Sequence, residues 1–222
     1  MGLRREIAAS AVGMLILTVI CGVLYPLAIT GVGQVAFRSN ADGQLVYRAG
    51  RLVGSRLIGQ SFATPVIDPR TGHVEMSGGE PVTRPDPRYF QTRPSGTVPA
   101  DNAAASSFAN YGPNSTITER AIAANIAAYI RLNGPYYPGG LTAAKVPVDA
   151  ADTSASGIDP DISIANADIQ AHRVAAVRQL PLRLVLRLVA RFTGGRGLGF
   201  SGEPTVNVLE LNLALDRLRG GR

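Results

Sequence analysis

The chain has 222 residues, of which 45% are hydrophobic, and its 22 Lys and Arg against 16 Asp and Glu give a net charge of +6. This length fits one domain with at most a small appendage, and so modest a positive charge does not indicate nucleic-acid binding. The single cysteine, Cys21, excludes a disulfide framework and a cysteine-ligated metal site in the rest of the chain.

A long apolar run near the amino end is the first predicted element. No charged residue occurs at the 31 positions from Ile7 to Phe37. As a helix, the part from Ile7 to Thr30 would be about 36 Å long, which exceeds the ~30 Å hydrocarbon core of a bilayer. We therefore predict a transmembrane anchor helix over residues 7–33, preceded by a short cytoplasmic amino terminus at residues 1–6.

Two alternatives for this run are a buried core helix and a cleavable signal peptide. A soluble helix rarely needs so long an uncharged stretch. A signal peptide has an apolar core of about 7–15 residues and a small-x-small cleavage site, whereas this run is longer and lacks a clean site. Ile20 before Cys21 also fails the lipoprotein pattern. An uncleaved anchor is favoured, with Arg4 and Arg5 on the cytoplasmic side, although basic residues also follow its far end: Arg38, Arg48 and Arg51.

Small residues within the anchor would let another membrane helix approach closely. We predict that they make the anchor an assembly element rather than only a tether: Gly13, Gly22, Gly31 and Gly33, with Ala8 and Ala11. The alternative is that they reflect the higher glycine content of membrane helices in general.

Residues 34–222 are predicted to form a mixed α+β domain outside the cytoplasm. Glycines separate short β-prone runs between residues 45 and 62, a pattern that indicates a hairpin. Seven of the fifteen prolines lie between residues 61 and 99, which excludes a helix or a central strand there. We predict a long surface loop, or insertion, at about residues 63–88.

Helices dominate the prediction for the remainder. The first begins near Ile117, capped by Ser115, Thr116 or Thr118, and ends at Asn133-Gly134-Pro135. KVPVD, at residues 145–149, indicates a short strand. The later helices are predicted at residues 165–179, at residues 181–194, and from Pro204 to Gly220-Gly221. Partial alternation leaves helix and strand both open for residues 205–215.

Two motifs resemble ligand sites. Gly197, Gly199 and Gly202 match G-x-G-x-x-G, but a dinucleotide site needs a strand before them and an acid about 20 residues later, so a connector is favoured. Asp159 and Asp161 resemble the beginning of a calcium loop, which fails at its glycine and its closing glutamate. A turn before the next helix is favoured for them, and a cation-attracting loop is the alternative.

A basic stripe is the third motif. Arg183, Arg187 and Arg191 recur every four residues opposite apolar positions, which predicts a basic amphipathic helix. Its charged face suits anionic lipid headgroups or an acidic partner, or is simply solvated. No Ser-His-Asp arrangement, nucleophile elbow, zinc-protease pair or phosphate loop is visible. No catalytic residue and no metal ligand is therefore predicted.

Four stretches, in the same order along the chain, resemble the C subunit of the bacterial Kdp-type potassium-transporting ATPase. They are GVLYPLAITGVGQVAF in the anchor, LVGSRLIGQSF followed by RYFQTRPSGT, DNAAASSFANYGPNS, and VPVDAADTSASGIDPDIS with the terminal LGFSGEPTVNVLELNLALD. Each is a weak signal alone, but together they are specific and extend over nearly the whole chain.

The chain departs from the family pattern in three places. The residues from about Thr64 to Arg84 look inserted. Asp161 stands where family members often carry histidine. Asp152-Thr153 and Ala155 alter a Ser/Gly-rich stretch that has been connected with nucleotide. No fixed role is carried over to these positions.

The resemblance implies a non-catalytic accessory subunit of a high-affinity, ATP-driven potassium uptake complex in the inner membrane, with its large domain periplasmic. The implied partners are a channel-like potassium-translocating subunit, an ATP-hydrolysing subunit, a small membrane subunit and membrane lipid. The implied role is to stabilise assembly and to raise the ATP affinity of the hydrolysing subunit. ATP and K⁺ would belong to the complex, and no cofactor is expected on this chain alone. A membrane-anchored extracytoplasmic enzyme and a lipid- or envelope-binding module remain the alternatives.

Overall fold

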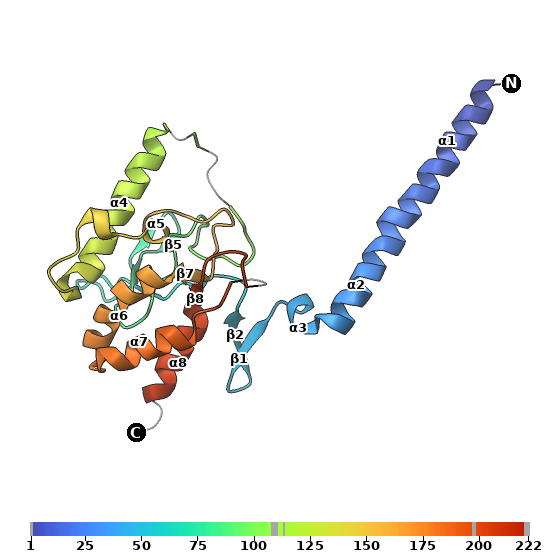
Figure 1. The fold of residues 1–222 in the computed structure, drawn as a ribbon. Coiled ribbons are helices and arrows are strands. Elements are labelled where there is room, and N and C mark those ends of the chain that lie inside the picture. Colours follow the sequence, from blue (N-terminus) through green and yellow to red (C-terminus); the bar gives the residue numbers. More distant parts are fainter. Residues whose placement is uncertain (1, 108–110, 113, 197–198, 220–222) are drawn as a thin grey trace. The chain divides into compact units, whose positions relative to one another are not determined.

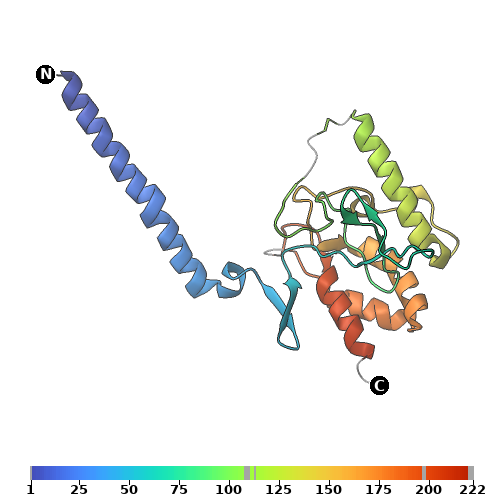
Figure 2. The same ribbon diagram turned by 180° about the vertical axis from the view of Figure 1, so that it is seen from behind.

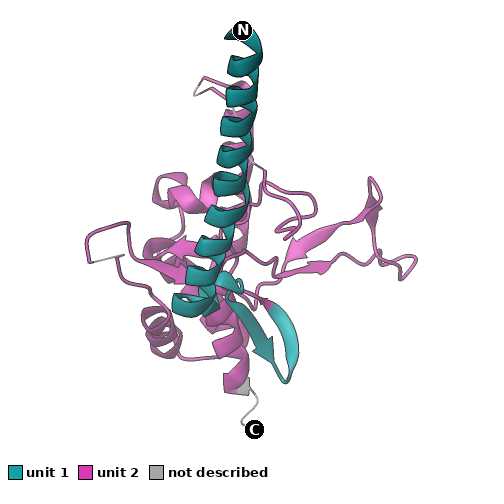
Figure 3. Ribbon diagram, turned by 90° about the vertical axis from the view of Figure 1, so that its right-hand side faces the viewer, with its two compact units in different colours: residues 1–53 teal, residues 54–222 magenta. Residues whose placement is uncertain are grey.

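The computed structural model describes residues 2–107, 111–112, 114–196 and 199–219 (Figure 1). The chain divides into two compact units, residues 1–53 and residues 54–222, which Figure 3 colours separately.

The first unit begins with a long helix. It consists of α1 (Gly2–Val19), a π-helical turn η1 (Ile20–Leu24) and α2 (Tyr25–Ala36). By length and composition this helix is able to cross a membrane, and none of its residues is buried within the chain. The predicted long apolar helix is confirmed, and its helical backbone extends beyond residues 7–33 at both ends.

The π-helical turn lies directly before Pro26. Proline lacks an N–H, and in a regular α-helix its ring clashes with the carbonyl group four residues earlier. Here the N–H of Tyr25 bonds to the carbonyl of Ile20, five residues back. The wider turn relieves the clash, so the helix passes Pro26 without ending.

A hairpin follows the short helix α3 (Arg38–Ala41). Strands β1 (Leu45–Arg48) and β2 (Arg51–Ser55) form a two-stranded sheet. Ala49 and Gly50 join them with φ angles of 49° and 76°. Positive φ at both positions of a two-residue loop is the type I′ arrangement, whose twist suits a hairpin. The hairpin predicted from the glycine spacing is confirmed.

The proline-rich segment of the second unit, for which the sequence predicts a long surface loop or insertion, contains short strands that pair as an antiparallel arm. Strand β3 (Ala63–Pro65) pairs with β6 (Thr83–Pro85), and β4 (Met76–Ser77) pairs with β5 (Glu80–Pro81). Each pair is a two-stranded sheet. Every strand therefore has a free edge, where a proline removes no ladder hydrogen bond. The prolines excluded a central strand but did not exclude edge strands.

Helix α4 (Thr116–Asn133) begins after Ser115, one of the three predicted caps, whose Oγ accepts a 3.4 Å bond from the Thr118 N–H. Three short helical turns follow: η2 (Gly134–Tyr136), η3 (Ala143–Lys145) and α5 (Val148–Ala151). The strand predicted in KVPVD is wrong. Asp149 in α5 accepts hydrogen bonds from the N–H and hydroxyl of Ser163, a tertiary contact that overrides the β preference of valine.

The core of the second unit lies between two strand–helix pairs. Strand β7 (Asp161–Ser163) is antiparallel to β8 (Thr205–Asn207). They lead directly into α6 (Ile164–Arg178) and α8 (Val208–Arg219), and α7 (Leu182–Arg191) packs against α6 (Figures 1 and 2). Buried apolar side chains of these elements, together with Phe90, form the core: Ile162, Ala167, Ala171, Val174, Ala175, Val185, Val189, Val206, Val208, Leu211 and Leu215.

Two predicted helix limits are wrong. The last helix begins at Val208 rather than at Pro204, because residues 205–207 pair with β7. Asn207 then caps the helix by accepting a 3.2 Å bond from the Glu210 N–H. The segment 205–215, left open by the sequence, is thus a strand followed by a helix. Helix α7 ends at Arg191 rather than at Gly194. Gly197, Gly220 and Gly221 lie outside the described residues.

Candidate functional site

An irregular segment, Arg88–Gln91, passes through the core and is held by side chains instead of neighbouring strands. Asn212 accepts a 2.9 Å bond from the N–H of Phe90 and donates a 2.9 Å bond to its carbonyl. Gln170 makes the same two bonds to Gln91, at 2.8 and 3.0 Å. One side-chain amide supplies both a donor and an acceptor. We call these two pairs the carboxamide clamps.

Two arginines of α6 complete the support of this segment. Arg173 donates from Nη2 to the carbonyl of Tyr89 at 2.8 Å, and Arg178 donates from Nε to the carbonyl of Arg88 at 2.6 Å. Arg173 is completely buried. Burial lowers the pKa of Arg173 to about 10, so its guanidinium remains charged at neutral pH. The segment is therefore fixed by four side chains from two helices.

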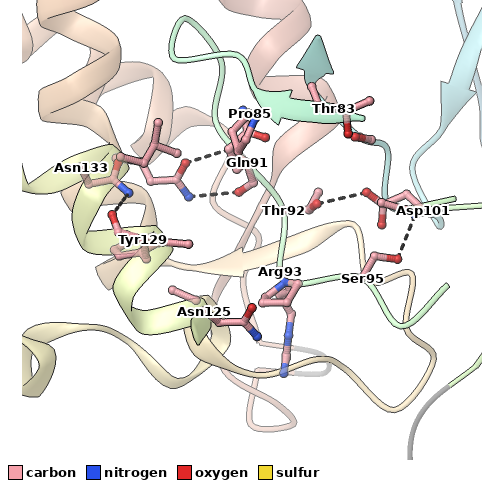
Figure 4. A pocket seen from close by; sticks show the side chains of 18 residues that line it. Thr83, Pro85, Gln91, Thr92, Arg93, Ser95, Asp101, Asn125, Tyr129 and Asn133 are labelled. Carbon is pink, nitrogen blue, oxygen red and sulfur yellow. Dashed lines mark hydrogen bonds between the residues drawn. The ribbon is translucent and has the colours of Figure 1, made fainter. Parts of the chain in front are cut away.

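The residues that follow the clamps line a cavity of about 270 Å³ (Figure 4). Helix α4 forms one wall, the base of the arm contributes a second, and the segment after Phe90 faces α4. The side chains labelled in Figure 4 are Thr83, Pro85, Gln91, Thr92, Arg93, Ser95, Asp101, Asn125, Tyr129 and Asn133.

A hydrogen-bond network fixes the α4 wall. The Tyr129 hydroxyl donates to Asn166 Oδ1 at 2.7 Å, and Gln170 Nε2 donates to the same oxygen at 2.9 Å. Asn166 in turn donates to Asp149 at 2.9 Å. Burial raises the pKa of Tyr129, so its hydroxyl is a neutral donor. Because Gln170 also belongs to a clamp, the wall and the clamped segment are positioned together.

Asp101 supplies the carboxylate of the cavity. Its Oδ2 accepts a 3.3 Å bond from the Thr92 hydroxyl, and its N–H donates to Ser95 Oγ at 2.9 Å. Burial raises the pKa of the Asp101 carboxyl, and the Thr92 hydroxyl offsets this in part. The backbone of Asp101 has a φ of 57°, a left-handed conformation that non-glycine residues seldom adopt.

Next to the cavity, three loops meet through their backbones. The Gly96 N–H donates to the carbonyl of Gly157 at 2.9 Å, and the Ser107 N–H donates to that of Ser156 at 3.2 Å. A Cβ atom at Gly96 or at Gly157 would overlap the carbonyl oxygen of Ser107. The Ser/Gly-rich stretch around Gly157 thus uses its backbone groups to join the loops.

The two predicted loop acids are sequence neighbours with separate partners. Asp159 lies 3.5 Å from Arg93 Nη1 and accepts a 3.0 Å bond from the Asp161 N–H. Asp161 accepts 2.9 Å bonds from Thr205 and Asn207 across the β7–β8 pair. Both carboxylates therefore have structural roles, and attraction of cations by them stays a prediction.

The anchor glycines have open surroundings within the chain. A Cβ added at Gly13 or Gly31 would meet nothing within 4 Å, and at Gly22 or Gly33 it would make only ordinary contacts, at 4.0 and 3.8 Å. The chain by itself therefore does not require glycine at these four positions, and their assembly role stays a prediction.

Helix α7 has the amphipathic character that its sequence predicts. Val185 and Val189 are buried, whereas Arg183, Arg187 and Arg191 are exposed.

Among the described residues, no group of three or more His, Cys, Asp and Glu is placed to hold a metal ion. His172 packs edge-on against Tyr137 at 5.4 Å between ring centroids.

Sequence reasoning missed the cavity. Neither Tyr129 nor Asp101 is among the site residues predicted from the sequence. One available signal was Asp101-Asn102, because Asp and Asn are the residues that tolerate left-handed backbone. The amides that build the clamps carried no such signal, because they lie on ordinary helices.

Comparisons with known proteins give one consistent result. Residues 7–217 match the family model described as the C chain of the K⁺-transporting ATPase, KdpC. The chain is 42% identical over 216 residues to the potassium-transporting ATPase KdpC subunit of Mycobacterium tuberculosis, covering 97% of this chain and 100% of the relative. It is 44% identical over 207 residues to the KdpC subunit of Methylococcus capsulatus, covering 93% and 94%. It is 43% identical over 203 residues to the KdpC subunit of Herminiimonas arsenicoxydans, which covers 91% of this chain and 92% of the relative.

Proposed function

The chain belongs to the KdpC family and is a non-catalytic subunit of the Kdp potassium-transporting ATPase complex, and from this we propose that its task is to hold that complex together. The observation that carries the proposal is a family match that includes both the membrane-capable helix and the domain, over residues 7–217. Such a chain is able to contact partners inside and outside the bilayer. The proposed partners are a channel-like potassium-translocating subunit, the ATP-hydrolysing subunit and a small membrane subunit.

Co-purification tests this proposal. After mild detergent extraction, cells that lack this chain should yield less of the complex between the channel-like and hydrolysing subunits.

We also propose that the chain raises the ATP affinity of the hydrolysing subunit by changing the conformation of that subunit, since an extracytoplasmic domain cannot touch cytoplasmic ATP. The ATP concentration for half-maximal hydrolysis should then rise without the chain. Unchanged yield together with an unchanged ATP requirement would contradict both roles.

We propose that residues 7–33 are an uncleaved anchor in the inner membrane, that residues 1–6 are cytoplasmic and that residues 34–222 are periplasmic. Arg4 and Arg5 support this orientation because basic residues that flank a membrane helix are retained on the cytoplasmic side. Protease added to intact spheroplasts should digest the domain after Ser39. Complete protection, with digestion only after the membrane is opened, would reverse the orientation. A mature amino terminus near Phe37 would show that the anchor is cleaved.

The anchor glycines offer a clean assembly test, because a side chain at Gly13 or Gly22 meets no close contact within the chain itself. Replacing both with leucine should leave membrane insertion unchanged but weaken co-purification of the complex, since leucine holds neighbouring helices apart. Leucine in place of Val12 and Val23, which are exposed residues of the same helix, is the matched control. Equal complex yield and equal potassium-stimulated ATPase activity for both variants would refute the assembly role.

We also propose that Asp159 and Asp161 attract cations. Changing Asp159 and Asp161 to asparagine should raise the potassium concentration for half-maximal ATPase activity, and salt should reduce the effect. Because Asp161 accepts bonds from Thr205 and Asn207, the folded domain must be verified by protease resistance. An unchanged potassium requirement at low salt in the assembled complex rules this role out.

A further inference from the structure

The carboxylate of Asp101 has no cationic partner among the residues that the structure describes. From the described side chains, this carboxylate accepts one hydrogen bond, the 3.3 Å contact from the Thr92 hydroxyl, which is long for an O–H donor. Burial nevertheless raises its pKa, which means that the charged form is poorly solvated. A charged group that is removed from water without a counter-charge is unfavourable unless a ligand supplies one.

The other titratable side chains that line the cavity do not supply that charge. Arg93 donates to the carbonyl of Thr153 at 3.0 Å and lies 3.5 Å from the Asp159 carboxylate. In Figure 4 its side chain extends away from the Thr92–Asp101 pair. Tyr129, on the opposite wall, is neutral and donates to Asn166. Within the described part of the chain, no cationic side chain therefore pairs with the Asp101 carboxylate in the cavity.

The backbone holds this carboxylate in place. Asp101 has a φ of 57°, a left-handed conformation that Asp and Asn tolerate better than most non-glycine residues. The hydroxyls of Ser95 and Thr97 fix it by accepting bonds from the N–H groups of Asp101 and Asn102, at 2.9 and 3.0 Å. The loop thus fixes the backbone from which the carboxylate projects.

The remaining lining indicates which cation fits. Pro85, Pro94, Ala100, Ala128 and Leu132 give the cavity apolar walls. Polar side chains also line the cavity, and a bare metal cation needs several oxygen atoms to replace its water shell, so the KCl control described below tests that alternative. A lysine side chain instead carries an ammonium group on a flexible apolar stem of four carbons. It matches the carboxylate and the walls together.

We propose that this cavity receives a lysine side chain from a partner subunit, with its ammonium group on the Asp101 carboxylate and its stem along Pro85, Pro94 and Ala128. This rests on the assembly role proposed above and gives that role a specific contact. A ligand without a positive charge would leave the Asp101 carboxylate without a counter-charge. A ligand without an apolar stem would leave the apolar side chains of the cavity in contact with water.

The first experiment uses the full chain in detergent micelles with n-butylammonium, which reproduces the end of a lysine. Alanine methyl groups labelled with ¹³C at Ala100 and Ala128 line the cavity and report binding by NMR. Saturable shifts of both signals are expected. Asp101→Asn should weaken binding at least about tenfold, as loss of one member of a partly buried ion pair does. In the unmodified chain, acidification through the pKa of Asp101 should release the probe, because protonation removes the charge.

Asp168→Asn is the matched control. It removes the same charge from a residue whose pKa burial also raises, but Asp168 lies in a different hollow, beside Ile164 and Leu186. This variant should bind the probe like the unmodified chain. The proposal is overturned if no saturable shift occurs, if Asp101→Asn binds equally well, or if KCl at the same concentration produces the same shifts.

The second experiment uses the assembled complex. A carbodiimide should join the Asp101 carboxyl to a lysine amine of a partner by an amide bond, which mass spectrometry would identify, and Asp101→Asn should remove that link. An intact complex in which Asp101 forms no link with a partner would overturn the partner assignment. Failure of the complex to depend on this chain is a different result, since it contradicts the assembly role while probe binding to the isolated chain stands.

Discussion

Replacing Asn212 by alanine should lower the free energy of unfolding of the second unit by roughly 2–6 kcal/mol, because two buried backbone groups would each lose their partner. Those groups are the N–H and the carbonyl of Phe90, a residue with 0% exposure. No neighbouring strand can replace the lost side-chain amide. The change is measured by denaturant unfolding of the full chain in mild detergent. The near-ultraviolet circular dichroism of its tyrosines is the signal that reports unfolding.

Asn125→Ala is the control for this variant. Asn125 donates one 2.9 Å bond to the carbonyl of Ala151 from a partly exposed position on the cavity wall. Its loss should cost no more than about 1 kcal/mol. Hydrogen exchange at the Phe90 amide gives a second readout, which should accelerate in Asn212→Ala alone. If the two variants had equal stabilities, the clamp would not be the main support of this segment.

Replacing Gly157 by alanine should be at least as damaging, with a loss of more than about 4 kcal/mol, the size that marks disruption of the core. Two effects add. Its φ of 74° is unfavourable for alanine, and the new Cβ would overlap the carbonyl oxygen of Ser107. Because that oxygen belongs to the backbone of a loop that is hydrogen-bonded to Ser156, the overlap is not relieved by rotating a side chain. The same unfolding assay measures the loss.

Gly139→Ala separates the two effects. Gly139 has nearly the same φ, 72°, but a Cβ there meets nothing within 4 Å. It should therefore show only the conformational cost, about 1–2 kcal/mol. The difference between the two variants is the contribution of the loop junction. Similar losses for both would mean that the junction opens easily, and the close approach of these loops would then have little energetic weight.

Local signals explain which elements the sequence predicts well. The long apolar helix follows from the uncharged run after Glu6, and α4 follows from Ser115, one of its three predicted caps. The β1–β2 hairpin follows from Ala49-Gly50, since glycine adopts positive φ readily. Each of these depends on residues that are close together in the sequence. The error at Pro204 has the opposite origin, because pairing of Val206 with Ile162 in a distant strand overrides a local helix signal.

The cavity could not be predicted for the same reason. Its clamped wall depends on Gln91 meeting Gln170, 79 positions later, and on Phe90 meeting Asn212. Neither amide stands out in a helix, where Asn and Gln are usually solvated. Asp101 could be predicted as a turn residue, but its burial depends on segments distant in sequence, such as Gly59, where an added Cβ would lie 2.9 Å from Asp101 Oδ1. A single sequence does not show which distant residues will meet. The long apolar helix and the helix caps can be predicted because they depend on neighbouring residues alone.

The clamp on Phe90 also sets an order of events during synthesis. Its two halves are 122 positions apart, and bacterial ribosomes add about 5–20 residues per second, so Phe90 waits roughly 6–24 s for Asn212. The apolar helix at residues 2–36 leaves the ribosome before Phe90 and Asn212 do. In the proposed topology, the membrane therefore receives its anchor while the core segment is still unclamped, and the domain crosses as an open chain. It closes only on the far side, after α8 has arrived.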